Sequence, residues 1–247
     1  MIGGGRAAAL VVLLAAIVAC SGSSPSGSIA SPGSSLQPDL LRYACGRFPF
    51  GPEILARGPG TAELDPNPAA AALRTHLARS EPDVDFLPDS GWILAGMDGS
   101  GAEFVTVGGD LGMKTVTVEN GPGGWAVTGW GDCQPRIVLA EGLGPAEWWF
   151  DLAKPLPGPE TQVFDALVTE MSCASGRTAD GRIVGPAIIA TEEVVLVMFA
   201  VRPLPGAQNC PSNPSTRVTV DLGEPLGERA LLDGGRLPPG DPTKPRF

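Results

Sequence analysis

Short apolar runs separated by glycine and proline are the feature that most limits what this chain can fold into. Its 247 residues include 34 glycines and 26 prolines, and 43% of the residues are hydrophobic. Proline and glycine interrupt helices, whereas short strands joined by turns accommodate both at their ends. The high apolar content argues against a disordered chain. The sequence therefore predicts a folded, mostly β protein whose turns fall at the glycine and proline clusters.

One segment departs from this pattern and predicts a helix. Asn67 suits the N-cap position and Pro68 suits the first helical position. Strong helix formers follow at 69–79, until Ser80 and Pro82 end the run. Two leucines four residues apart give this helix an apolar face, so it can pack on a sheet.

After residue 92 the hydrophobic period changes to two, which is typical of strands. Turns at 98–101 and 120–124 divide this region into two hairpins, and residues 137–140 suggest a fifth strand. The segment 45–60, before the helix, holds too many prolines and glycines for a regular element and is expected to be extended chain. The four hairpin strands are expected at 92–97, 103–109, 114–119 and 125–130.

A proline-rich break at 154–160 is expected to separate two domains. Before it, residues 41–153 are predicted to form an α+β domain in which one helix packs on an antiparallel sheet. After it, residues 154–247 are predicted to form a small β-sandwich-like domain. The strands of that domain are expected at 162–170, 182–190, 194–201 and 216–222. The predicted fold class is thus α+β and mostly β.

The first 20 residues have the layout of an export signal. A single positive residue, Arg6, precedes an apolar run at 7–18, which is shorter than the roughly 20 residues that a membrane-spanning helix needs. Residues 17–20, Ile-Val-Ala-Cys, resemble the lipobox of bacterial lipoproteins. The resemblance implies cleavage before Cys20 and acylation of its thiol. An ordinary secretory leader, with an incidental cysteine at this position, is the alternative.

The residues after the cysteine have the composition of a flexible tether. Residues 21–37 carry no charge and few apolar side chains, so they cannot bury enough surface to fold. We therefore expect a signal peptide at 1–19 and a lipid-anchored linker at 20–40. The predicted location is extracytoplasmic, with the chain anchored to the cell membrane through the lipid on Cys20.

Four cysteines remain once Cys20 is set aside, and disulfides are expected outside the cytoplasm. Four cysteines allow three pairings. We favour Cys45 with Cys133 and Cys173 with Cys210, because each bond then stays within one predicted domain. No C-x-x-C pair occurs, so neither a zinc site nor a redox dithiol has its usual signature.

The sequence offers little catalytic chemistry, and we predict no catalytic, cofactor-binding or metal-binding residue. His76 is the one histidine, and no carboxylate lies at a helical spacing that would orient its imidazole. We expect it to be a partly exposed helix residue. The densest acidic stretch contains two prolines and is expected to be an exposed loop, with a cation site or a catalytic carboxylate pair as the alternatives. Its acidic residues are Glu81, Asp83, Asp85 and Asp89.

The tryptophans are the remaining candidates for a binding surface. Trp125 and Trp130 are five residues apart on one predicted strand and are expected on opposite faces. Trp148 and Trp149 are adjacent. Burial in the core is one reading of this pair, and an exposed surface for a protein or glycan partner is the other.

Four segments rich in turn residues resemble exported proteins of high-GC bacteria to which no function is assigned. The segments are WGDC at 130–133, CASGRTADGRI at 173–183, LPGAQNCPSNP at 204–214 and EPLGERALLDGG at 224–235. The resemblance implies an exported protein and does not imply an activity.

The formal net charge of −10 disfavours a nucleic-acid partner, because phosphate binding needs clustered lysine and arginine. The membrane, reached through Cys20, and an envelope protein or glycan are the expected partners. The sequence thus predicts a lipid-anchored extracytoplasmic module that binds without catalysis. The alternatives are a small carboxylate-dependent hydrolase and a solute-capture lipoprotein. A deep pocket with two close carboxylates would favour the hydrolase.

Overall fold

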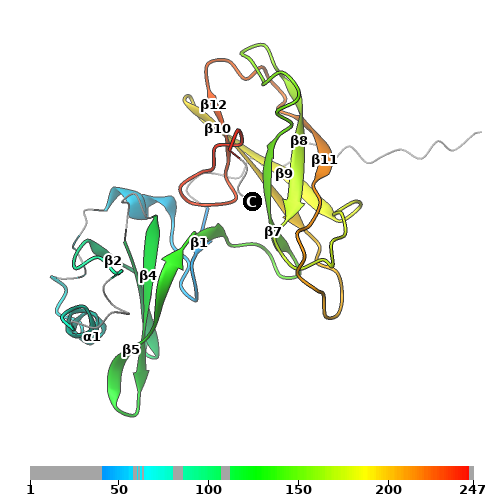
Figure 1. Cartoon of the computed structure of the whole chain (residues 1–247). Helices are drawn as coiled ribbons and strands as arrows, with labels where there is room; N and C mark the ends of the chain where they lie inside the picture. Colours follow the sequence, from blue (N-terminus) through cyan, green and yellow to red (C-terminus); the bar gives the residue numbers. More distant parts are fainter. Residues whose placement is uncertain are drawn as a thin grey trace, which may run out of the picture. The chain divides into compact units, whose positions relative to one another are not determined.

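The computed structural model describes residues 41–57, 60, 62, 64–79, 86–106 and 112–244 (Figure 1). The predicted signal peptide, the linker at 20–40 and Cys20 lie outside the described residues. No helix in the described part is long and apolar enough to cross a membrane.

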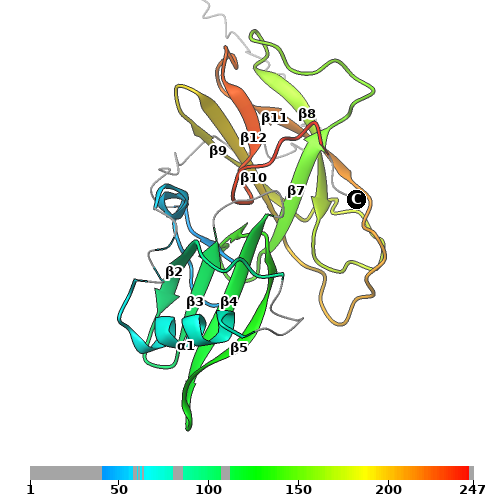
Figure 2. The ribbon, with the colours of Figure 1, turned by 60° about the vertical axis from the view of Figure 1, so that its left-hand side comes forward.

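The first sheet is a four-stranded antiparallel meander covered by one helix (Figure 2). The helix, α1 (Pro68–Leu77), begins where the sequence predicts, because Asn67 Oδ1 accepts a hydrogen bond from the Ala70 amide at 2.7 Å. Leu73 of the helix and Phe104 of the sheet are fully buried in the core between them. Both predicted hairpins are confirmed. The strands are β2 (Trp92–Met97), β3 (Gly101–Thr106), β4 (Met113–Gly121) and β5 (Gly124–Cys133).

A bulge in β5 overturns one prediction about this sheet. The pairing of β4 with β5 shifts by one residue, and Thr128 is the extra residue on the β5 side. An extra residue reverses the side-chain alternation beyond it. Trp125 and Trp130 therefore both pack against the core beneath the helix, and the prediction of opposite faces is wrong.

The segments that flank this sheet also differ from expectation. The stretch predicted as extended chain contains a 3₁₀ helix, η2 (Pro52–Ala56), since Pro52 suits a first helical position. The predicted fifth strand is reduced to β6 (Arg136–Ile137), which pairs with β1 (Tyr43–Ala44) and does not join the meander. Pro135 interrupts the chain between β5 and β6, which limits extension of the meander.

The second sheet has six strands in the order β11-β8-β7-β10-β12, with β9 on the other edge of β10. The four strands predicted after 154 are confirmed as β8, β9, β10 and β11. Two more strands complete the sheet, and β12 runs parallel to β10. The bounds are β7 (Gly144–Phe150), β8 (Val163–Glu170), β9 (Ile183–Ala190), β10 (Val194–Val201), β11 (Thr216–Asp221) and β12 (Ala230–Asp233).

Strand β7 makes this sheet curl. Its first residue, Gly144, pairs with Val201 of β10, whereas its last residue, Phe150, pairs with Ala166 of β8. Strands on both sides of this corner contribute to one core, and Trp148 Nε1 donates a hydrogen bond across it to the Val197 carbonyl at 2.9 Å. The arrangement agrees with the predicted α+β, mostly β fold. The domain boundary predicted at 153/154 stays a prediction.

A third core cluster includes residues of both sheets. Tyr43 comes from β1, Ile93 and Val105 from the four-stranded sheet, and Met198 from β10. All four side chains are buried. This cluster lies next to the buried charges described below.

Candidate functional site

Both predicted disulfides form. Cys45 is bonded to Cys133 at the end of β5, and Cys173 is bonded to Cys210 between two loops of the second sheet. Persistent disulfides form in oxidising compartments, so they indicate an extracytoplasmic location.

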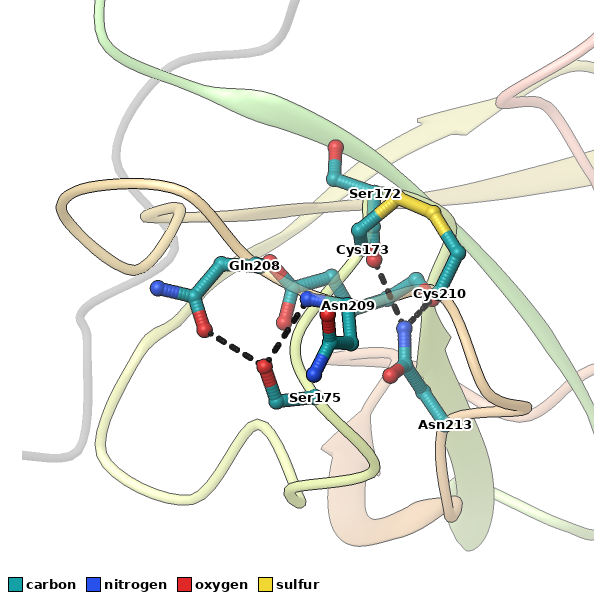
Figure 3. The surroundings of a disulfide bond; sticks show 8 residues. Ser172, Cys173, Ser175, Gln208, Asn209, Cys210 and Asn213 are labelled. Carbon is teal, nitrogen blue, oxygen red and sulfur yellow. Dashed lines mark hydrogen bonds between the residues drawn. A yellow bond between two sulfur atoms is a disulfide. The ribbon is translucent and has the colours of Figure 1, made fainter.

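Hydrogen bonds join the two loops that the second disulfide connects (Figure 3). The Ser175 hydroxyl donates to Gln208 Oε1 at 2.9 Å and accepts from the Asn209 amide at 3.1 Å. Asn213 Nδ2 donates to the Ser172 carbonyl at 2.7 Å. The Ser175 hydroxyl is thus held by amides and no general base contacts it, so these contacts support a structural role for the loops.

A groove of about 260 Å³ opens beside the proline-rich segment 154–160. The rings of Phe150 and Phe164, at a centroid distance of 5.7 Å, contribute to its lining. Pro155, Leu156 and Pro157 line it from the loop. The groove is lined by apolar and charged side chains in similar measure, and it lies at the end of β7 and the start of β8.

Exposed aliphatic side chains gather at this groove. Leu156 and Val163 line it with 52% and 53% of their surface exposed, and Leu152, in the same loop, is 58% exposed. Contiguous exposed apolar residues of this kind mark interaction sites on many proteins. The other exposed large apolar residues of the described part come from separate segments and include Leu64 and Val138.

Two carboxylates border the groove, and Arg217 lies between them. Its guanidinium contacts Asp151 at 2.9 Å and Asp165 at 3.1 Å, and Lys154 contacts Asp165 at 3.0 Å. The hydrogen bond from Arg217 lowers the pKa of Asp151, and hydrogen bonds from Lys154 and Thr219 lower the pKa of Asp165. A catalytic acid needs a carboxyl that keeps its proton near neutral pH. This pair stays ionised, so it does not support the hydrolase alternative.

A second group of charges is buried. Asp233 is 3% exposed, and its Oδ1 accepts a hydrogen bond from the Gly235 amide at 2.9 Å. Burial raises the pKa of Asp233 to about 7, and Glu147 adds to the rise. Hydrogen bonds from the Gly235 and Trp148 amides and the charge of Arg236 oppose it. Burial, followed by the charge of Asp233, raises the pKa of Tyr43 to about 12.

Perturbed pKa values often mark functional sites, but networks of structural charges produce them too. Glu147 is paired with Arg136 at 2.8 Å and is 8% exposed. The buried group is shielded from solvent. It can therefore gain or lose a proton, but it cannot contact a substrate. No single residue of this group was singled out from the sequence. The Gly-Gly pair at 234–235, directly after a strand, is the signal that marks such a close backbone approach.

Some of the candidate residues predicted from the sequence are buried in the structure, and others are exposed. His76 is 4% exposed and its ring lies 4.7 Å from that of Trp130, so the expected partial exposure is wrong. Trp148 and Trp149 are 2% and 9% exposed, because β7 is an inner strand covered on both faces. They cannot form an exposed partner surface. Asp89 is exposed, whereas Glu81, Asp83 and Asp85 lie outside the described residues.

Among the described residues, no three histidine, cysteine or acidic side chains gather as metal ligands. No protein-family model, no curated protein and no solved structure matches this chain.

Proposed function

We propose that this chain is a lipid-anchored extracytoplasmic binding module that holds an apolar segment of a basic envelope protein in the groove beside 154–160. The observation that carries the proposal is the pair of exposed aliphatic side chains Leu156 and Val163 at a groove with an aromatic lining. Burying one such side chain in a partner's surface contributes roughly 1.5–3 kcal/mol.

The size of the groove favours a polypeptide partner. Sites for small molecules typically enclose roughly 300–1,000 Å³. The groove holds about 260 Å³, which suits one or two side chains of an extended peptide. A stacking site for a sugar ring is less well supported, because Trp148 and Trp149 are buried.

The charge of the chain favours a basic partner. The formal net charge is −10, and the ionised Asp151 and Asp165 lie at the groove itself. Complementary charge steers partners together and excludes partners of like charge. Arg217 and Lys154 neutralise part of the local field, so the selectivity rests on the whole surface as well as on the groove.

The lipid anchor rests on the lipobox at 17–20 and on the uncharged segment that follows it. The two disulfides support export. Lipid on Cys20 would hold the groove near the membrane surface, where envelope proteins are concentrated. More than one acyl chain is needed for stable anchoring.

A binding measurement with defined peptides tests the proposal. The probe is a fluorescent peptide with leucine and proline at its centre and lysines on both sides, measured by anisotropy with the full mature chain. Leu156→Ser should weaken binding about tenfold or more, because an apolar contact is lost. Leu64→Ser is the matched control, since Leu64 is 86% exposed outside the groove, and it should leave the affinity unchanged. Equal affinities for the two variants, or no binding to the wild type, would overturn the proposal.

A further inference from the structure

A short polar segment is buried beside the third core cluster. Gly234, Gly235, Arg236 and Leu237 follow strand β12, and all four are buried, as is Asp233 at the end of that strand. We call residues 233–240 the junction segment. Its burial is unusual, because charged side chains such as those of Asp233 and Arg236 are rarely buried.

Backbone hydrogen bonds fix the junction segment to three neighbours. The Gly234 amide donates to the Val197 carbonyl of β10 at 3.1 Å. The Gly235 carbonyl accepts from the Ile137 amide of β6 at 3.0 Å. The Tyr43 hydroxyl of β1 donates to the Gly234 carbonyl at 3.0 Å. The segment thus links elements that are far apart in the sequence.

Close packing leaves the segment little room to move. A Cβ on Gly234 would lie 2.9 Å from Met198 Cγ and 3.0 Å from Leu196 Cβ, both on β10. Asp233 and Gly240 exchange two backbone hydrogen bonds of 2.8 Å, which close the segment into a loop. The Asp233 carboxyl therefore cannot reach water without opening the junction.

The groups that face Asp233 come from every element packed against it. Glu147 of β7 repels its negative charge, and Arg236 of the junction segment attracts it. Tyr43 of β1 interacts electrostatically with it. Strand β10 contributes uncharged side chains, and β6 contributes Arg136, which is paired with Glu147.

We propose that Asp233 is a proton-binding switch of the junction segment: a proton on its carboxyl tightens the junction, and loss of the proton loosens it. The ionised carboxylate has a like charge, Glu147, nearby and is removed from water, which costs free energy in the folded state. The protonated carboxyl carries no charge, so Glu147 does not repel it and no charge is removed from water. An extracytoplasmic chain meets the pH of its surroundings directly, so the switch would couple the stability of this core to that pH.

The direction of the effect follows from linkage. Burial raises the pKa of Asp233 from 3.8 to about 7, so the folded chain holds this proton in a pH range where the unfolded chain has lost it. Stability from this group is fully present below about pH 4 and is lost as the pH rises to about 7. Within that window one bound proton changes the unfolding equilibrium constant by up to about tenfold per pH unit.

Denaturant unfolding of the full mature chain between about pH 5 and pH 8 tests the switch. Asp233→Asn keeps an oxygen that can accept the Gly235 hydrogen bond and removes the charge. Asp89→Asn changes an exposed carboxylate away from the junction segment and is the matched control. We expect the unfolding constant of the wild type and of D89N to rise by up to about tenfold per pH unit below about pH 7, and that of D233N to rise much less. The difference between wild type and D233N cancels the other titrating groups.

Parallel curves for the wild type and D233N would overturn the switch. If D233N does not fold, the carboxyl carbon of Asp233 in the wild type can be titrated by NMR. A midpoint near 7, as its buried position implies, supports the proposal. A midpoint below about 5 contradicts it, because such a group would be ionised throughout the physiological range.

Discussion

The Tyr43 hydroxyl donates a buried hydrogen bond of 3.0 Å to the carbonyl oxygen of Gly234, 191 residues away in the sequence. This contact joins β1 to the junction segment. Tyr43→Phe removes the donor and leaves the Gly234 carbonyl without it. We expect a loss of about 1–3 kcal/mol in the free energy of unfolding, measured by denaturant titration. A change of less than about 0.3 kcal/mol would mean that water replaces the hydroxyl.

Gly234→Ala tests the close packing of the junction segment. The new methyl group would meet Met198 and Leu196 at 2.9 and 3.0 Å, so we expect a loss of about 1–3 kcal/mol in stability. Gly129→Ala on β5 is the control, because a Cβ there meets nothing within 4 Å. It should change stability by no more than about 0.5 kcal/mol. Equal effects of the two substitutions would show that backbone freedom, rather than packing, decides the outcome.

The two disulfides should contribute differently to stability. Cys45 and Cys133 are 88 residues apart in the sequence, and Cys173 and Cys210 are 37 residues apart. In the chain-entropy model their removal costs about 4.6 and about 3.9 kcal/mol, respectively, as upper values. Double alanine variants of each pair, unfolded in denaturant, measure the two losses. A larger loss for the shorter separation would contradict the entropic account.

Arg217→Met tests the charge arrangement at the groove. Without the guanidinium, the pKa values of Asp151 and Asp165 should rise towards the ordinary value of 3.8, as observed by NMR titration of the carboxyl carbons. Lys154 still contacts Asp165, so Asp151 should respond more strongly than Asp165. If neither pKa moved, the two ion pairs would not persist in solution.

Cys20→Ala tests the membrane tether. Wild-type chain should partition with membranes and should carry acyl chains detectable by mass spectrometry, whereas the variant should be released from them. Binding of the lysine-flanked peptide should be the same for both proteins in detergent, because the groove is formed by other residues. Membrane association of the variant at the level of the wild type would exclude the lipid anchor.

Local signals in the sequence predict much of this fold. The N-cap at Asn67 and the turns at 98–101 and 120–124 place the helix and both hairpins, because capping and turn chemistry act within a few residues. The disulfide pairing follows from the order of the predicted elements along the chain.

Features that depend on distant contacts could not be predicted in this way. The bulge at Thr128 changes which face Trp130 occupies. The adjacent Gly129 is compatible with a bulge, but a glycine in a strand does not by itself determine the register. The parallel pairing of β12 with β10 buries Asp233, although its Asp-Gly-Gly sequence is typical of an exposed turn. The groove lies between the end of β7 and the start of β8. The sequence does not show that these residues lie close together, because their proximity depends on how the two strands pair.

The claim that the groove binds a basic, apolar peptide is tested most directly by methyl NMR of the full mature chain with the lysine-flanked peptide. We expect shifts of the Leu156 and Val163 methyl signals, with those of Leu64 and Val138 unchanged. The same peptide with glutamate in place of lysine should produce smaller shifts. Perturbations centred on Leu64 or Val138, or none at saturating peptide, would contradict it.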